Sequence, residues 1–185
     1  MSVPTSFLRA VLLASLVLVV ACQRDAVEPS HGADLHTVPV YLALTQEFGF
    51  GKDSPEWELV ADALPFERIS LWRSGCYGSC PVYRVDYYKD GRVVYLGEDY
   101  VDHVGRFDFV DALSDFALLA ANVEVMGLLA LDDEYAAGWT DDETVTLEIE
   151  GSFGVKNIED YGRQGPPLLR AFHDLVDRRT ERLFD

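Results

Sequence analysis

Two cysteines in a short glycine-containing segment, residues 75–81, are the residues best placed to do chemistry in this sequence. Cys76 and Cys80 lie four positions apart, and Gly75 and Gly78 permit the tight turn that brings their Cα atoms within the roughly 4.4–6.8 Å that a disulfide needs. Outside the cytoplasm such a pair is usually oxidised. We therefore predict a structural disulfide, which shapes so short a loop more than it stabilises the fold. We call residues 75–81 the Cys loop.

Three other chemistries stay open for these two thiols. Thiolates favour Cu(I), and Cys-x-x-x-Cys-Pro resembles the copper loop of the Sco-type copper chaperones, although there a helix follows the motif and here a strand is expected. A redox-active dithiol would need thiols of low pKa, at a helix N-terminus or beside a base. Free thiols are the last alternative. Tyr77, Gly78, Ser79 and Pro81 of the same loop are candidate binding residues.

The third cysteine, Cys22, follows an apolar run at residues 10–21, which is preceded by a short start with one base, Arg9. This order is typical of a secretory signal, and the run is shorter than the about 20 apolar residues of a transmembrane helix. Residues 19–22, Val-Val-Ala-Cys, resemble a lipobox, whose cysteine receives a diacylglycerol thioether. We predict that residues 1–21 are a lipoprotein signal peptide and that Cys22 carries the lipid; a plain signal peptide is the alternative.

This anchor predicts where the protein is located. Acyl chains on Cys22 would hold it to a membrane, since each buried CH₂ adds about 0.8 kcal/mol. Gln23, next to the cysteine, resembles the pattern that sorts lipoproteins of Gram-negative bacteria to the outer membrane. We expect a lipid-anchored protein of the cell envelope, facing the periplasm if the source is Gram-negative.

The rest of the chain divides into three parts. Residues 22–37 are polar and read as a flexible tether, in which His31 and His36 are better explained as solvated residues than as metal ligands. Residues 38–66 form a lead-in, with a strand expected at 38–44 and a helix beginning near Ser54-Pro55. Residues 67–185 form the main domain.

Alternating and helical apolar patterns predict an α+β fold for that domain. Strands are expected at residues 68–73, 82–88, 92–96, 104–109, 144–149 and 153–158, and helices at 111–125 and from Pro166 onward. Asp90-Gly91 suits a two-residue hairpin turn, Asp111 can cap the first of these helices, and Leu168 is expected on the inward side of the second. The prediction is a small antiparallel sheet of hairpins with two amphipathic helices packed on one face.

Other polar groups favour ordinary structural roles over a catalytic or metal site. The acidic stretches 132–134 and 141–143 lack the ligand pattern of a calcium loop and are interpreted as solvated. His103 is expected on the surface, and Tyr161, beside Asp160, is expected to donate to a carboxylate. Four aromatic residues, Trp72, Tyr77, Tyr83 and Tyr87, could form a recognition surface. Alternating positions in strands, however, more often indicate that aromatic side chains pack in the core. No catalytic residue, metal site or cofactor is predicted.

The net charge of −17 limits the partners. A strongly acidic surface repels nucleic acid, whose phosphates are dense negative charges, and its simplest consequence is solubility. We therefore expect no nucleic acid partner. The expected partners are the membrane, through Cys22, and another protein or component of the envelope.

Several short motifs together resemble a known family. They are Ile69-Ser70-Leu71, the Cys loop with Val82-Tyr83, the segment 89–95, Asp133-Glu134-Tyr135 and Asp160-Tyr161-Gly162. They are similar to the bacterial domain-of-unknown-function family 6438, common in secreted and lipid-anchored proteins, over about residues 67–177. The resemblance implies an α+β domain and no activity. The predicted function is a binding or structural module without catalysis, with a thiol-dependent copper-binding or redox protein as the alternative.

Overall fold

The computed structural model describes residues 51–185. The expected signal peptide, Cys22, the tether with its two histidines and the strand expected at 38–44 lie outside the described residues. Within residues 51–185, no helix combines the length and the apolar character needed to cross a bilayer.

The domain is built on a seven-stranded sheet with the order β4-β3-β2-β1-β6-β7-β5. The strands are β1 Phe66–Arg73, β2 Val82–Tyr88, β3 Val93–Asp99, β4 Gly105–Phe109, β5 Glu134–Ala136, β6 Thr144–Gly151 and β7 Gly154–Tyr161. Every neighbouring pair is antiparallel except β5 and β7, which run parallel. The predicted α+β class is confirmed.

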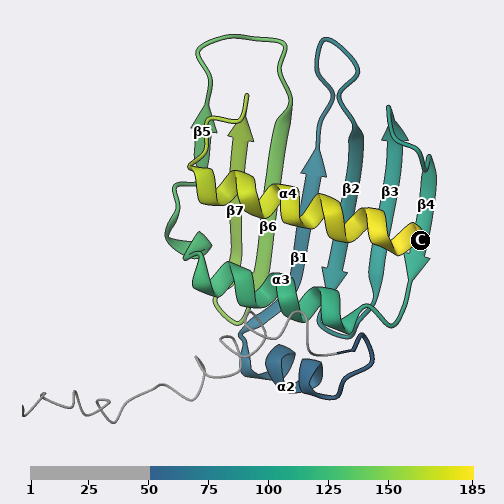
Figure 1. Ribbon diagram of the computed structural model, residues 1–185. Helices are drawn as coiled ribbons and strands as arrows, with labels where there is room; N and C mark the ends of the chain where they lie inside the picture. The colour runs from purple at the N-terminus through teal and green to yellow at the C-terminus, as the bar shows by residue number, and fades with distance from the viewer. Residues whose placement is uncertain (1–50) are drawn as a thin grey trace, which may run out of the picture. The chain divides into compact units, whose positions relative to one another are not determined.

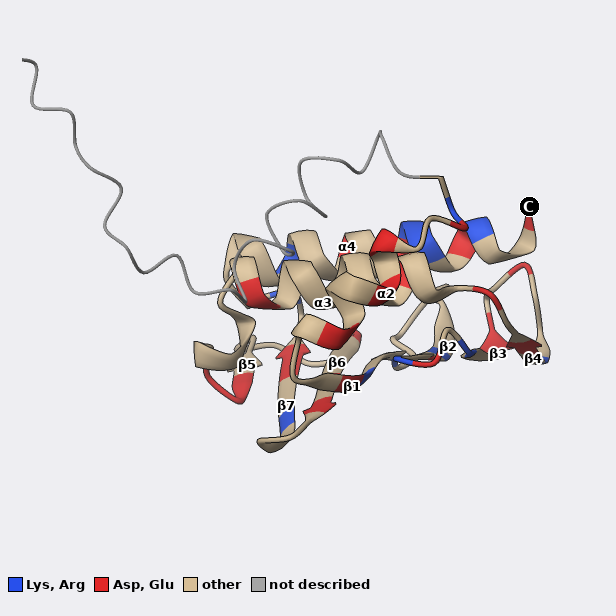
Figure 2. Cartoon of the chain, turned by 90° about the horizontal axis from the view of Figure 1, so that it is seen from below, with Lys and Arg blue, Asp and Glu red and all other residues tan. Residues whose placement is uncertain are grey.

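Three helices lie on one side of this sheet. They are α2 Glu56–Ala63, α3 Leu113–Val125 and α4 Pro167–Glu181. Helices α3 and α4 run across the strands, and α2 lies beside α3 (Figure 1). Among residues 51–185, Figure 2 shows the helices on one side of the sheet and none on the other. We call these sides the helix face and the open face.

The period-two pattern of the strands decides which side chains meet the helices. Leu71, Val85 and Leu147 have no exposed surface and belong to one apolar core with the helices. The lead-in helix α2 adds Trp57 and Val60 to that core. Burying this face against the helices leaves the open face to polar side chains, as is common for antiparallel sheets.

Helix α3 is buried on more sides than a single amphipathic stripe requires. Its seven buried residues include Leu118 and Ala121 as well as the expected stripe residues Phe116, Ala117 and Ala120. The extra burial follows from its position, because α3 contacts α2 and α4 as well as β1 and β2. A helix with neighbours on several sides is apolar on several sides.

Three local predictions were wrong. Asp111 has φ of +63° and caps nothing; Ala112 precedes α3 without a side-chain cap. Leu168 is 54% exposed, because the inward side of α4 begins one residue later, at Leu169, and one residue turns a helix by about 100°. The hairpin between β2 and β3 has a three-residue loop in which Gly91, at φ of +81°, donates to the carbonyl of Tyr88, the G1-bulge arrangement of such loops.

Strand β5 was not predicted. It is three residues long, Glu134–Ala136, and lies in the segment interpreted as an acidic loop. Its pairing with β7 orders it, for example through the N–H of Glu159 donating to the carbonyl of Asp133 at 2.9 Å. So short a strand has no alternation to detect, and its partner follows it by more than twenty residues.

Candidate functional site

A cleft of about 630 Å³ opens on the helix face, at the end of the sheet that carries the Cys loop. Its floor comes from the end of β1 and the start of β2, and its walls come from α4 and from the loop between β3 and β4. Because these elements are far apart in the chain, the cleft is a product of the sheet order and of the path of α4 across it.

A buried arginine forms the floor of the cleft. Arg73, 4% exposed, donates from Nη2 and Nε to the two carboxylate oxygens of Asp177, at 2.6 and 3.2 Å, and from Nη1 to Glu143 at 3.0 Å. The Tyr83 hydroxyl donates to Asp177 as well. Such two-point contacts fix the guanidinium geometrically. The four side chains therefore form a rigid, internally paired framework.

The electrostatics keep Arg73 and Tyr83 each in one protonation state. Burial opposes the charge of Arg73, but the hydrogen bond and negative charge of Asp177 and the charge of Glu143 outweigh it, so its pKa is raised. Burial, with the nearby Asp177, also raises the pKa of Tyr83 far above its usual value. Arg73 is therefore always a cation and Tyr83 always neutral in the range where proteins function.

Aromatic rings form one wall of the cleft. His103 stacks on Phe184 with ring centroids 3.8 Å apart, and Phe184 meets the edge of Tyr95 at 5.2 Å. Tyr95 in turn lies 5.5 Å from Tyr83. Tyr100, 58% exposed, stands at the rim. The wall is thus a continuous aromatic surface beside the charged floor.

The charges that line the cleft are mostly negative. Six acids and two arginines contribute, so the formal balance is 2 − 6 = −4. Both arginines are paired, Arg73 as described and Arg163 with Asp174 at 3.3 Å. Among the described residues no ion pair involves the remaining acids, which are Asp102, Glu181 and Asp185. Acids beside aromatic rings are the surroundings in which a cationic group binds best.

The Cys loop lies next to this cleft. Cys76 and Cys80 are at disulfide distance, with their Cα atoms 5.6 Å apart, as predicted from the spacing. Of the candidate binding residues, Pro81 lines the cleft, whereas Tyr77 is 91% exposed at the tip of the loop. Gly78 and Ser79 are exposed beside Tyr77. The copper and redox alternatives for the two sulfurs stay predictions.

The other predicted aromatic residues separate between the two faces. Tyr83 and Tyr87 are buried on the helix face, and the Tyr87 hydroxyl meets that of Thr180 at 3.0 Å. Trp72 lies on the open face and is 47% exposed. The prediction of core packing was thus correct for the two tyrosines and wrong for the tryptophan, since β1 presents Trp72 on the side that no helix of residues 51–185 covers.

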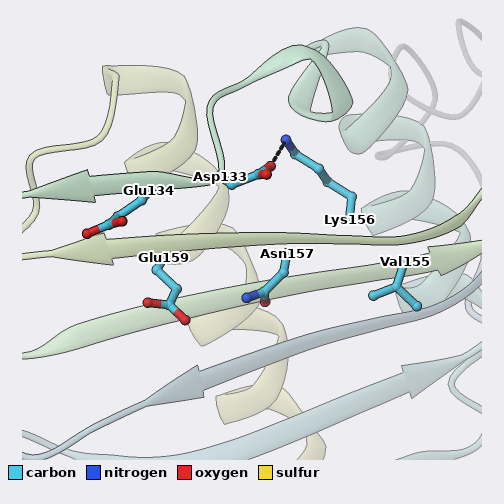
Figure 3. A pocket seen from close by; sticks show the side chains of 6 residues that line it. All are labelled: Asp133, Glu134, Val155, Lys156, Asn157 and Glu159. Atoms are coloured by element: carbon cyan, nitrogen blue, oxygen red, sulfur yellow. Dashed lines mark hydrogen bonds and ion pairs between the residues drawn. The ribbon is translucent and has the colours of Figure 1, made fainter.

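The first acidic stretch borders a hollow of about 390 Å³ at the β5–β7 edge. Figure 3 shows Lys156 reaching Asp133 there, away from Asn157 and Glu159. Lys156 also donates to the carbonyl of Leu131 at 2.6 Å. In the part of the chain that is described, no three His, Cys, Asp or Glu side chains are grouped to hold a metal ion. This hollow is a less convincing site than the cleft, because the lysine already neutralises Asp133.

The Asp160-Tyr161 motif contains a fully buried carboxylate, that of Asp160. Asp160 is fully buried and accepts from the N–H of Gly165 at 2.7 Å; its other oxygen lies 3.9 Å from Nδ1 of buried His173. Neither that oxygen nor His173 Nε2 has a hydrogen-bond partner among residues 51–185. The Tyr161 hydroxyl accepts from the N–H of Asp142 at 3.1 Å and makes no hydrogen bond to a carboxylate of residues 51–185, so the expected partner was wrong.

Arg73 and Asp177 were not predicted as site residues. Glu143 was interpreted as part of the solvated stretch 141–143, which was wrong, because its side chain is 13% exposed and pairs with Arg73. One signal was available: in β1 the inward positions run Ile69, Leu71, Arg73, and a charged residue that continues an apolar face requires a buried partner. The partner itself could not be predicted from the sequence, because Asp177 lies 104 positions further along the chain.

Comparison with known proteins agrees with the motifs. No curated protein matches the chain. Residues 67–180 match the family model described as a domain of unknown function, DUF6438. That segment contains the Cys loop and every strand except the first residue of β1. The match covers well over half of the sequence, and the chain belongs to this family.

Proposed function

We propose that the protein is a lipid-anchored component of the cell envelope, attached through Cys22, and that its domain is a binding module without catalysis. Its cleft beside the Cys loop takes a positively charged group, such as a basic side chain of another envelope protein. The observation that carries this proposal is the cleft itself: about 630 Å³, a net lining charge of 2 − 6 = −4 and an aromatic wall.

The size and position of the cleft support binding of a side chain or small ligand. Protein pockets for small ligands usually measure about 300–1,000 Å³ and combine apolar walls with a few placed polar groups. Asp102 and Glu181 stand at the opening of the cleft with exposed carboxylates, and Tyr95 and Phe184 supply apolar wall. A lysine or arginine side chain could place its stem on the rings and its charge between the acids.

The floor of the cleft argues for binding over catalysis. A general acid or base works best when its pKa lies near the operating pH. Arg73 and Tyr83 have pKa values raised away from neutrality, and Asp177 is engaged by both of them. Arg73 and Tyr83 therefore keep fixed protonation states and exchange no protons near neutral pH.

A titration with matched peptides tests the binding site. Hexalysine and its fully Nε-acetylated form are titrated into the full chain in detergent micelles and followed by calorimetry. We expect only the charged peptide to bind, and Asp102→Asn with Glu181→Gln to weaken it about tenfold, or about 1.4 kcal/mol.

The control variant addresses the general acidity of the protein. Asp132→Asn with Glu134→Gln removes two exposed charges away from the cleft, and it should leave the affinity nearly unchanged. Equal weakening by both double variants would mean that hexalysine responds to the overall charge of −17 and would reject the cleft as the site.

The anchor and the state of the Cys loop are tested by intact mass. The protein is taken from its native membrane and alkylated with and without prior reduction. Acyl mass on the N-terminal cysteine, with alkylation of Cys76 and Cys80 only after reduction, is the expected result. Alkylation without reduction would favour the thiol-dependent copper or redox function, and a mass without acyl chains would reject the anchor.

A further inference from the structure

The open face of the sheet carries a second, unrelated feature. Most of its charged side chains are paired with each other: Arg84 with Asp86 at 2.9 Å, and Arg68 with Glu150 at 2.9 Å. Trp72, by contrast, is a large aromatic side chain on this otherwise mostly polar face. It lies on β1, the middle strand of the seven, and 47% of its surface is exposed on a side that no helix of the described part of the chain covers.

The indole N–H distinguishes Trp72 from the other tryptophans of the domain. Trp57 Nε1 donates to the carbonyl of Gly51, and Trp139 Nε1 donates to Asp142, both at 3.0 Å. Trp72 has no such acceptor within residues 51–185. An exposed aromatic ring with a free donor is suited to stack on a ligand and bind it at one edge.

Polar side chains without partners lie on one side of this ring. Thr146 is the cross-strand neighbour of Trp72, and Glu159 is the neighbour of Thr146. With strands spaced at 4.7–4.9 Å, Glu159 is about 10 Å from Trp72, and Asn157 is about 7 Å further along β7. The three side chains make no hydrogen bond to other described residues.

The orientation of these groups makes them one surface. Figure 3 shows Asn157 and Glu159 projecting from the same side of β7, while Lys156 turns towards Asp133. A hollow of about 250 Å³ lies over this part of the open face and is bordered by Trp72, Thr146, Asn157 and Glu159 among others. A flat ring is thus followed by a hydroxyl, an amide and a carboxylate.

We propose that this surface is a carbohydrate-binding site for a neutral, β-linked glycan. One pyranose ring lies with its apolar C–H face on Trp72. Neighbouring hydroxyls of the next sugar donate to the two oxygens of Glu159 and bond with the amide of Asn157, which both donates and accepts. Because Trp72, Thr146 and Glu159 lie in a row across three neighbouring strands, an extended chain of equatorially linked sugars fits them better than a compact ligand does.

The charges around the ring favour this ligand class. The guanidinium of Arg84 is already held by Asp86, so little positive charge is left for a phosphate or a nucleic acid. Glu159 would repel both. An extended apolar partner would bury the paired charges of Arg84 and Asp86, which is costly. A ligand rich in hydroxyls satisfies the free polar groups without displacing these pairs.

Nuclear magnetic resonance on the full chain in detergent micelles tests the proposal, because each of the three tryptophans gives its own indole N–H signal. The probes are N-acetylchitotetraose and cellotetraose, which separate an amino-sugar glycan from a plain glucan. We expect a saturable shift of the Trp72 signal with at least one probe. Trp72→Ala should weaken binding about tenfold, Trp72→Tyr should restore part of it, and Asn157→Ala should weaken it several-fold.

The matched control is Trp139→Phe, which removes an exposed tryptophan away from this surface and should leave binding intact. Absence of a Trp72 shift with both glycans, unchanged affinity in Trp72→Ala, or a shift with a proline-rich peptide alone would overturn the proposal. Since the cleft lies on the other face of the sheet, hexalysine binding is unaffected by each of these outcomes.

Discussion

The two faces of the sheet contain arginine–carboxylate pairs of nearly the same length in opposite surroundings. On the helix face, Arg73 Nη2 lies 2.6 Å from Asp177 and the arginine side chain is 5% exposed. On the open face, Arg106 Nη2 lies 2.7 Å from Asp108 and the two side chains are 61% and 53% exposed. Water screens the second pair and cannot reach most of the first, so distance alone says little about what each pair does.

The largest effect should come from breaking the buried pair. Asp177→Ala leaves the buried guanidinium of Arg73 and the hydroxyl of Tyr83 without their main partner. We expect a loss of about 3–5 kcal/mol in the free energy of unfolding, measured by urea denaturation at pH 7.

Asp174→Ala is the matched control on the same helix. Asp174 pairs with an arginine that is 52% exposed, and its removal should cost less than about 1 kcal/mol. Equal losses in the two variants would show that water reaches Arg73 freely and would remove the distinction between the two faces.

The next largest effect is the pH dependence of stability that the buried His173 causes. Burial, together with the nearby positive charges of Arg73 and Arg163, lowers the pKa of His173 from 6.5 to about 3. The unfolded chain therefore takes up a proton below pH 6.5 that the folded chain refuses, so stability is complete above pH 6.5 and falls as the pH drops towards 3. At pH 5 this histidine alone should cost about 2 kcal/mol relative to pH 7.

Two measurements check the state of His173. Its ring proton shifts, followed by nuclear magnetic resonance, should stay those of a neutral imidazole down to pH 4. In His173→Asn, the loss of stability between pH 7 and pH 5 should shrink by about the same 2 kcal/mol. An imidazolium at pH 5, paired with Asp160, would give the opposite pH dependence and reject this assignment.

A smaller effect is expected at the Cys loop. Loop-closure entropy for a ring of about five residues predicts about 2 kcal/mol at most for the Cys76–Cys80 bridge. Cys76→Ser with Cys80→Ser should lower the unfolding free energy by no more than that, and the melting transition should stay cooperative. A much larger loss would mean that the loop supports the floor of the cleft through Pro81.

Local sequence patterns predicted much of this fold because their causes are local. The alternation of β1, β2 and β6, the glycine turn before β3 and the proline start of α4 each depend on a few neighbouring residues. The exposed Leu168 is an error of one helical position, and the loop before β3 is one residue longer than predicted. Strand β5 needed β7 to exist as a strand, and no local pattern encodes that pairing.

The candidate sites were harder to predict for the same reason. The cleft requires Arg73 from β1, Glu143 from the residues before β6 and Asp177 from α4, and only the sheet order brings them together. The surface around Trp72 depends on which side of β1 the helices cover. Trp72 is a large apolar residue and was expected in the core, and only the position of the helices shows that it lies on the open side.

The smallest effect belongs to the exposed pair and is best measured as a pKa. The hydrogen bond from Arg106 holds the pKa of Asp108 below its usual value. A carboxyl group whose pKa is lowered by folding stabilises the fold at a pH above its unfolded pKa, and this contribution is lost as the pH falls. Because water screens so exposed a pair, Arg106→Met should not measurably change the unfolding midpoint. In nuclear magnetic resonance titrations, both Arg106→Met and 1 M NaCl should move the Asp108 pKa back towards its ordinary value, since the screening length in that salt is about 3 Å. If the pKa of Asp108 did not change with salt concentration, Arg106 and Asp108 would have to be shielded from water, for instance by a second molecule on the open face.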